Sequence, residues 1–308
     1  MPRFFRRTLP CLVLVAATAP KAVTAQRSQD KAALFQSICW EAAPTIGHLG
    51  VIAQLTIPEQ CRFTEASGAR TFMEVTENPT NGYEQGVLLC RNSEETDPWF
   101  VLFRYEPVGY IKDDEGKSLD AAQLLSSIKQ GTAAANERRR QKGWDTLAVE
   151  GWVREPYYDG VTHNLTWALQ ARSNGAPVVN HSVRLLGRSG VLHADLVTDP
   201  AQMVAVMTTF HRAIAGTTFV PGQTYAEWRT GDKVAAYGLT ALVAGGAGAA
   251  AAKLGLFSKL WKLIAGLFVA LWKLLVVAVV GVASWVRSLF KTKDAAPRSP
   301  TSPPTSAA

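Results

Sequence analysis

Four short apolar-rich runs lie between positions 146 and 198, and the first of them alternates apolar and polar residues, a pattern typical of half-buried β-strands. Gly, Asn and Pro residues separate the runs, and the last two runs meet at GRSG, residues 187–190, which predicts a tight turn. Upstream, residues 98–107 (PWFVLFRYEP) are almost continuously apolar, which predicts a buried strand. The middle of the chain is therefore expected to form a sheet.

Helical patterns flank these strands. Residues 118–143 carry apolar side chains at helical spacing and end in Gly143, and Ser118 is positioned to cap this helix. Residues 199–216 begin with Asp-Pro, which suits the first turn of a helix. Because the strands come in runs rather than alternating with helices, the pattern predicts an α+β fold in which helices cover an antiparallel sheet.

The ordered patterns start at about residue 46, so we expect one α+β domain over residues 46–233. Residues 26–45 show no clear period, and we expect them to be poorly ordered.

The longest apolar run, residues 263–286, follows this domain. Its fourteen Leu, Ile, Phe and Val residues favour membrane insertion by roughly 4–8 kcal/mol, against a cost of about 3 kcal/mol for the central Lys273. The sequence therefore predicts a membrane-spanning helix over residues 254–292. The Pro-, Ser- and Thr-rich residues 293–308 are expected to be disordered.

The Ala- and Gly-rich stretch 234–252 has two interpretations. It is either a juxtamembrane helix, which leaves one span, or the first span of a two-helix hairpin. Gly238 and Gly245 belong to a set of small residues at helical spacing, and Lys273 lies on a narrow stripe of small and basic residues. Because helices approach closely at small residues, we expect these three positions to pack helices in the membrane.

The first 25 residues have the parts of a secretory signal peptide. A basic MPRFFRR precedes a short apolar stretch, and small residues lead to the bond between Ala25 and Gln26. We expect cleavage at this bond. The domain would then lie outside the cytoplasm, tethered to the inner (plasma) membrane.

The basic charge lies at the two ends of the chain. Of the net charge of +7, residues 1–25 carry +4 and residues 253–308 carry +7, so the residues between them are net acidic. The predicted domain has no basic stripe with interleaved aromatic residues, and we expect no nucleic-acid partner.

Three cysteines follow the predicted signal: Cys39, Cys61 and Cys90. Three cysteines in an exported domain allow two alternatives: one disulfide with one free thiol, or no disulfide at all. No Cys-x-x-Cys pair occurs, which argues against a zinc knuckle.

Two short stretches contain groups that are able to carry chemistry. The adjacent acids Asp113, Asp114 and Glu115 offer oxygen ligands for a divalent cation, but they lack the alternate spacing of a calcium loop. The stretch from Tyr157 to His163 offers an acid and a base close together in sequence. The acidic stretch is equally compatible with a solvated turn that binds no metal. The stretch from Tyr157 to His163 is equally compatible with an ordinary loop between strands.

A series of segments resembles the bacterial family of membrane-anchored proteins named domain of unknown function 2167. The resemblance covers about residues 50–255 and implies a bacterial origin and a membrane anchor, but no activity, ligand, catalytic residue or cofactor. Its segments include GYIKDDEGKSLDAAQLLSSIKQG (109–131), GWVREPYYD (151–159), NHSVRLLGRSGVL (180–192) and GDKVAAYGLTALVAGGAGAAAAKLG (231–255).

We therefore expect a non-enzymatic binding or scaffolding module of the bacterial envelope that needs no cofactor. Its expected partners are the membrane, other envelope proteins, or a second copy through the membrane helix. The alternative is an envelope hydrolase or metal-dependent enzyme that uses Asp113 and Asp114 or the loop from Tyr157 to His163.

Overall fold

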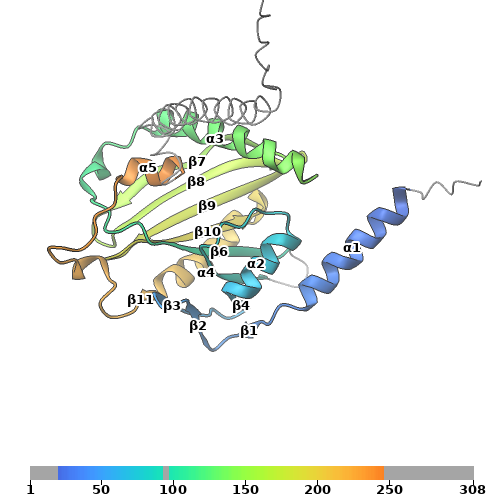
Figure 1. Ribbon diagram of the computed structural model, residues 1–308, viewed down its shortest axis with the longest axis horizontal. Helices are drawn as coiled ribbons and strands as arrows, with labels where there is room; N and C mark the ends of the chain where they lie inside the picture. Colours follow the sequence, from blue (N-terminus) through green and yellow to red (C-terminus); the bar gives the residue numbers. More distant parts are fainter. Residues whose placement is uncertain (1–19, 93–96, 246–308) are drawn as a thin grey trace, which may run out of the picture. The chain divides into compact units, whose positions relative to one another are not determined.

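A computed structural model of the chain describes residues 20–92 and 97–245 (Figure 1). The strands are β1 (Glu41–Ala42), β2 (Ile46–Leu49), β3 (Ala53–Thr56), β4 (Cys61–Glu65), β5 (Glu84–Cys90), β6 (Trp99–Glu106), β7 (Leu147–Asp159), β8 (Asn164–Ser173), β9 (Ala176–Leu186), β10 (Val191–Thr198) and β11 (Thr217–Phe219). The helices are α1 (Pro20–Gln36), α2 (Ala66–Val75), α3 (Ala121–Gln141), α4 (Met203–Ala215) and α5 (Leu239–Ala244), with short 3-10 helices η1 (Asp114–Lys117), η2 (Pro200–Gln202) and η3 (Tyr225–Glu227).

Eight strands form one antiparallel sheet in the order β1-β4-β5-β6-β10-β9-β8-β7. After β6 the chain passes through η1 and α3 to the far edge of the sheet, and the meander from β7 to β10 then returns until β10 pairs with β6. Residues about ninety positions apart in sequence thus become neighbours at the centre of the sheet. A smaller sheet has the order β11-β3-β2.

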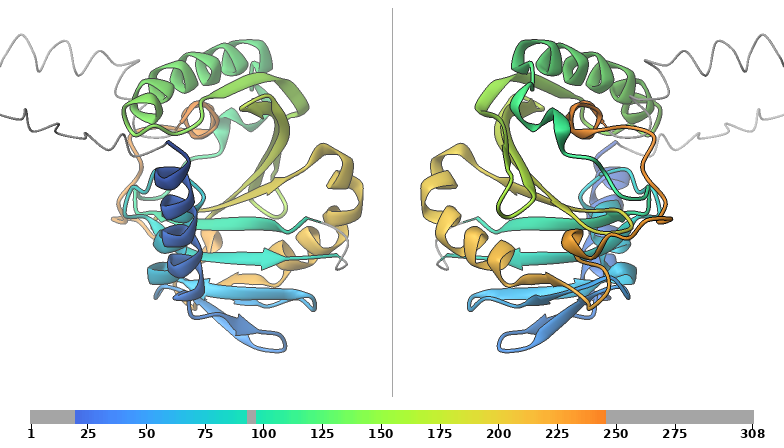
Figure 2. Two further views of the ribbon diagram at one scale, coloured as in Figure 1. Left: turned by 90° about the vertical axis from the view of Figure 1, so that its right-hand side faces the viewer. Right: turned by 90° about the vertical axis from the view of Figure 1, so that its left-hand side faces the viewer.

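One face of the large sheet is apolar and packs on α4 and the small sheet (Figure 2). Val101 and Phe103 of β6 and Leu192 of β10 share a buried cluster with Phe210 of α4 and Leu55 of β3. Side chains point alternately to the two faces of a strand, so the residues between these on β6 and β10 face the other side of the sheet.

The other face carries two separate apolar clusters. Phe72 of α2 packs with Leu102 of β6 in one cluster, and Leu124 of α3 and Leu242 of α5 pack with Leu165 of β8 in the second. Between them the sheet presents charged side chains.

The structure confirms the predicted α+β class with a large antiparallel sheet and helices. It corrects the cap of α3: Asp120, not Ser118, accepts a hydrogen bond of 2.9 Å from the backbone N–H of Gln123. Ser118 instead follows η1 as its C-cap. Both residues are small and polar and lie just before the apolar pattern begins, so the sequence does not separate them.

The domain is longer than the predicted range 46–233. Residues 26–45, in which we expected little order, contain the end of α1 and also β1, which pairs with β4. At the other end, α5 buries Leu239 and Leu242 in the domain.

No helix in residues 20–92 and 97–245 is long and apolar enough to cross a membrane. The predicted membrane helix over 254–292, the tail over 293–308 and most of the predicted signal peptide lie outside the described residues. In the range 234–252, the described part is the six-residue α5 and its flanks.

Cys61 and Cys90 form a disulfide between the neighbouring strands β4 and β5, where they are register partners. Cys39 is exposed and has a free thiol. Of the two alternatives left open by the sequence, the structure shows one disulfide with one free thiol.

Candidate functional site

A row of polar residues crosses the large sheet between its two apolar clusters. Strand register pairs Glu84 with Arg104, Arg104 with His193, and His193 with Arg184, so that four neighbouring strands each contribute one side chain. Register partners lie on the same face of a sheet. Together they form a charged rung (Glu84, Arg104, His193 and Arg184).

Asp195, two residues after His193 on β10, joins the two arginines of the charged rung. Its carboxylate accepts hydrogen bonds from Arg104 Nη2 at 2.7 Å, Arg184 Nη1 at 2.8 Å and Ser182 Oγ at 2.7 Å. Burial alone would raise the pKa of this carboxyl, but Arg184 and Arg104 hold it well below its usual range. Asp195 is therefore ionised whenever the protein is folded near neutral pH.

The two arginines are only partly satisfied by these contacts. The Arg184 guanidinium also lies over the Trp167 ring, 4.6 Å from its centroid, and its side chain is only 7% exposed. The Nε atoms of Arg104 and Arg184 are buried and have no hydrogen-bond partner among the described residues. Buried polar atoms are nearly always paired, so two such donors in one rung need an explanation.

His193 lies between the arginines and is neutral near pH 7. Burial lowers its pKa to about 4, and the positive charge of Arg184 acts in the same direction. Its Nε2 lies 3.3 Å from Glu106 Oε2, a contact that becomes an ion pair only when the ring is protonated and that lacks the alignment of a hydrogen bond. Neither ring nitrogen has a hydrogen-bond partner within the part of the chain that the structure describes.

A cavity of about 160 Å³ opens over the charged rung. We refer to it as the pocket. Leu242 and Gly245, at the C-terminal end of α5, form one wall of it. Its lining residues are Asn81, Tyr83, Arg104, Glu106, Arg184, His193, Leu242 and Gly245.

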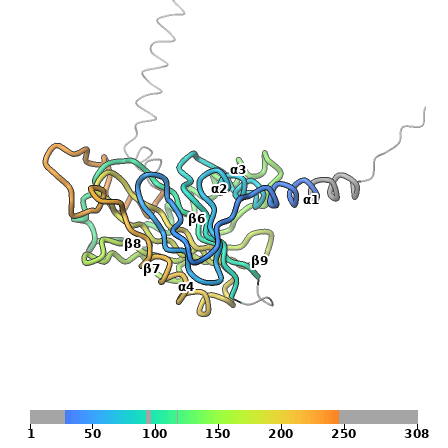
Figure 3. The backbone as a smooth tube through the Cα atoms, turned by 90° about the horizontal axis from the view of Figure 1, so that it is seen from below, coloured from blue at the N-terminus to red at the C-terminus, as the bar shows by residue number. Residues whose placement is uncertain are grey.

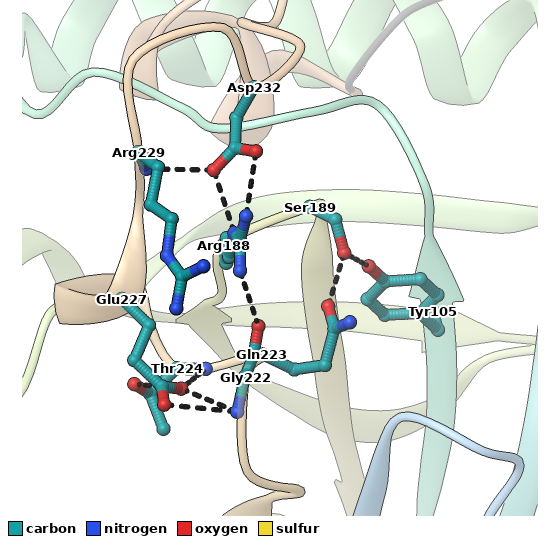
Figure 4. A network of polar contacts seen from close by, with 9 residues as sticks. All are labelled: Tyr105, Arg188, Ser189, Gly222, Gln223, Thr224, Glu227, Arg229 and Asp232. Atoms are coloured by element: carbon teal, nitrogen blue, oxygen red, sulfur yellow. Dashed lines mark hydrogen bonds and ion pairs between the residues drawn. The ribbon is translucent and has the colours of Figure 1, made fainter.

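A strap, residues 220–238, leads to α5 and is drawn in orange at the left of Figure 3. It contacts the turn between β9 and β10. Arg188 in the turn makes a two-pronged ion pair with Asp232 in the strap, with Nε–Oδ2 and Nη2–Oδ1 distances of 2.7 and 2.8 Å (Figure 4). Ser189 donates to Gln223 and lies 2.9 Å from the Tyr105 hydroxyl. These contacts fix the strap to the sheet and so position α5 beside the pocket.

The strap also closes the second apolar cluster. The Tyr225 ring stacks on Tyr110 at 4.4 Å, and its hydroxyl donates to the carbonyl oxygen of Ile111 at 2.8 Å. Gly187 lies close to both β11 and the strap: an added Cβ would lie 2.8 Å from two ring atoms of Phe219 and 3.0 Å from the Gln223 carbonyl oxygen. A side chain at this turn would have to displace the Phe219 ring.

The three acids proposed as metal ligands serve different partners. Asp113 accepts a hydrogen bond of 2.7 Å from the Tyr158 hydroxyl, Asp114 is exposed, and Glu115 accepts one of 2.9 Å from the backbone N–H of Thr240 at the start of α5. Across the described residues, no group of three His, Cys, Asp or Glu residues is arranged to hold a metal ion.

The loop from Tyr157 to His163 also differs from the expectation. Tyr157 points outward and is 57% exposed, whereas its neighbour Tyr158 lies 3.0 Å from His163 Nδ1. Burial, with a smaller contribution from Asp113, raises the pKa of Tyr158 far above its usual range, so this hydroxyl keeps its proton. Asp159 accepts a hydrogen bond of 2.8 Å from the backbone N–H of Val161 and holds the turn.

Gly238 and Gly245, which we expected to pack helices in the membrane, lie at the two ends of α5. Gly238 is its N-cap, and an added Cβ would lie 2.7 Å from a carboxylate oxygen of Glu115. Gly245 is its C-cap with φ of 119°, a conformation that side chains rarely adopt. Lys273 lies outside the described residues.

Ala25 and Gln26 lie within α1, which runs from Pro20 to Gln36. Cleavage between these two residues stays a prediction.

Two buried histidines should make the stability of the domain depend on pH. Burial lowers the pKa of His181 and of His193 to about 4, so between pH 4 and about 6.5 the unfolded chain binds more protons than the folded one. The free energy of unfolding should therefore fall as the pH is lowered through this window, by up to roughly 3 kcal/mol per histidine.

Replacement of His181 by leucine tests this expectation, since its ring packs on Phe210, 5.2 Å away. Urea unfolding at pH 7 and pH 4.5 should show a smaller difference in stability for His181→Leu than for the wild type. The matched control His48→Leu, at an exposed position, should keep the full difference. An unchanged difference in His181→Leu would contradict the expectation.

Comparison with known families identifies the chain. Residues 42–283 match the family model described as protein of unknown function DUF2167. The chain belongs to this family. The match includes β1 and α5 and continues beyond the described residues, so the DUF2167 region is longer than the range of about 50–255 expected from the sequence.

Neither relatives nor solved structures assign a function to this DUF2167 member. No curated protein matches it. The solution structure of the cyanobacterial PsbP protein CyanoP from Synechocystis sp. PCC 6803 is similar, with 12% identity over 60% of this chain and 93% of that chain and a TM-score of 0.35. The protein of unknown function PA94 from Pseudomonas aeruginosa has 14% identity over 44% and 81%, with a TM-score of 0.26. At these TM-scores neither likeness supports a function.

The charged rung was missed because its members are scattered through the sequence. Arg104 and Glu106 sit at the polar end of a strand recognised as buried, and Arg184 interrupts the apolar run of β9. A charge inside a strand with buried neighbours is the one signal that the sequence offers. It does not tell which charges share a rung, because that depends on the strand order.

Proposed function

We propose that this DUF2167 protein is a non-enzymatic binding module of the bacterial envelope, and that the pocket over the charged rung is its binding site. One observation carries the proposal: Arg104, Arg184 and His193 line one cavity with buried polar atoms that have no hydrogen-bond partner among the described residues. A polar ligand in the pocket would supply those partners, and desolvated donors left unpaired are costly.

The chemistry of the pocket favours binding over catalysis. Asp195 stays ionised between two arginines, and His193, with a pKa of about 4, is far from the range in which a histidine exchanges protons at neutral pH. The Ser182 hydroxyl, which adjoins the charged rung through Asp195, donates to that carboxylate rather than to a base. The hydrolase alternative has less support, since Tyr158 keeps its proton and Asp113, Asp114 and Glu115 face different partners.

The proposed location follows from the two ends of the sequence. A signal peptide cleaved between Ala25 and Gln26 and a spanning helix over 254–292 would place the domain outside the cytoplasm on the inner membrane. The disulfide between Cys61 and Cys90 is compatible with an oxidising compartment. Other envelope proteins, or a second copy through the helix around Lys273, are then the proposed macromolecular partners.

Native mass spectrometry of the full chain tests the proposal. The protein is purified from bacterial membranes in detergent and incubated with a desalted small-molecule extract of the same cells. The wild type should start at Gln26 and carry a small-molecule adduct. Leu242→Trp, which fills the pocket from α5, should lose the adduct, while the exposed control Val204→Trp should keep it. Equal adducts in the three proteins, or none in the wild type, would overturn the binding proposal.

A further inference from the structure

A second group of polar side chains lies on the face of the large sheet opposite the pocket. Strand register pairs Arg154 of β7 with Ala168 of β8, and Ala168 with His181 of β9. Register partners share a face of the sheet, and His181 packs on Phe210 of α4, with 5.2 Å between the ring centroids. Arg154 and His181 therefore both lie on the side of the sheet that faces α4.

The strand spacing allows these side chains to share a ligand. Neighbouring strands are about 4.8 Å apart, so the backbones of Arg154 and His181 are roughly 10 Å apart, with only the methyl group of Ala168 between them. His211, the residue after Phe210 on α4, is close enough for its charge to act on His181, as does that of Arg154. Two strands and a helix thus form a basic cluster (Arg154, His181 and His211).

No carboxylate balances the basic cluster. Burial lowers the pKa of His181 to about 4, and the positive charges of His211 and Arg154 act in the same direction, with no acidic group opposing them. Arg154 is exposed, and its side chain makes no ion pair or hydrogen bond among the described residues. An anion placed here would therefore reduce an existing repulsion instead of adding to a charge that is already neutralised.

His181 also brings an unsatisfied polar atom to the basic cluster. The residue is only 2% exposed, and its Nδ1 is buried without a hydrogen-bond partner in the part of the chain that the structure describes. A neutral imidazole carries one N–H donor, and a buried donor that stays unpaired is costly. An acceptor oxygen beside the ring would satisfy this donor.

We propose that the basic cluster binds a phosphate group, either as the free ion or as part of a phosphate ester. This inference goes beyond the proposed function, because the site and the pocket lie on opposite faces of the sheet. The Arg154 guanidinium would donate to two phosphate oxygens, in the two-pronged geometry that arginine forms with phosphate. His181 and His211 would each donate one N–H to the remaining oxygens. Donors from three elements suit the four oxygens of a phosphate better than the two of a carboxylate.

Isothermal titration calorimetry on the detergent-purified full chain tests the class of ligand. The probes are inorganic phosphate, glycerol 3-phosphate and acetate, in a buffer with sodium chloride so that general screening of charge is the same throughout. Phosphate or its ester should bind about tenfold more tightly than acetate. Tighter binding of inorganic phosphate assigns the site to the free ion, and tighter binding of glycerol 3-phosphate assigns it to esters. No binding of either, or equal binding of acetate, overturns the inference.

Two pairs of variants connect the binding to the basic cluster. Arg154→Gln removes the full charge and should weaken the binding of the preferred phosphate probe about tenfold. Its matched control is Arg172→Gln, at an exposed arginine of β8 that pairs with Glu150, and it should bind as the wild type does. His211→Leu should weaken the binding severalfold, whereas His48→Leu, also at an exposed histidine, should leave it unchanged. Wild-type affinity in Arg154→Gln and His211→Leu would show that phosphate binds elsewhere and would reject the site.

Discussion

Replacing Asp195 by asparagine should lower the free energy of unfolding by about 3–5 kcal/mol, because it removes the carboxylate that pairs with both the buried Arg184 and the partly buried Arg104. Asparagine has nearly the same size, so the effect isolates the charge rather than the packing. Urea unfolding of the full chain in detergent should show a lower midpoint with an unchanged slope.

The exposed Asp97 supplies the matched control, and Asp97→Asn should change the stability by less than about 0.5 kcal/mol. A second variant tests the mechanism. If the loss comes from unpaired positive charge, adding Arg184→Met to Asp195→Asn should restore part of the stability, since one of the two repelling cations is removed. Additive losses in the double variant would show that the charges act independently.

Removing the disulfide should have a comparable effect. Cys61 and Cys90 are 29 residues apart, and a loop of this length constrains the unfolded chain by roughly 3–4 kcal/mol in the chain-entropy model. The double variant Cys61→Ala, Cys90→Ala should lose about this much in urea unfolding without reductant. Cys39→Ala, which removes the exposed thiol, should behave as the wild type. A wild type whose stability does not change on addition of a reductant would contradict the prediction.

The sequence predicted those features of the fold that depend on local pattern. The four strand-like runs correspond to β7 to β10, the apolar run at 98–107 contains β6, and the segment that starts with Asp-Pro forms η2 and α4. The boundaries of the domain were less accessible. Leu239, Leu242 and Val243 stand in an Ala- and Gly-rich stretch that also suits a membrane helix, and only their burial in the second apolar cluster assigns them to the domain.

The pocket was beyond sequence reasoning for a topological reason. Glu84, Arg104, Arg184 and His193 become neighbours only because the chain crosses to the far edge of the sheet after β6 and returns at β10. Local periodicity contains no information about this crossover. The sequence suggested Asp113 and Tyr157 because other acidic or basic side chains stand close to them in the chain. In the structure, Asp113 accepts a hydrogen bond from Tyr158, and Tyr157 is exposed to solvent.

The position of α5 has a mechanical consequence. Gly245 belongs to the wall of the pocket and is also the point from which the chain continues into residues 246–308. Any tension along that part of the chain acts first on α5, which is held by only a few buried side chains, whereas the strap behind it is fixed by the paired contacts of Arg188 and Asp232. Under a pull from its C-terminal side, the protein would thus open its pocket well before the sheet begins to yield.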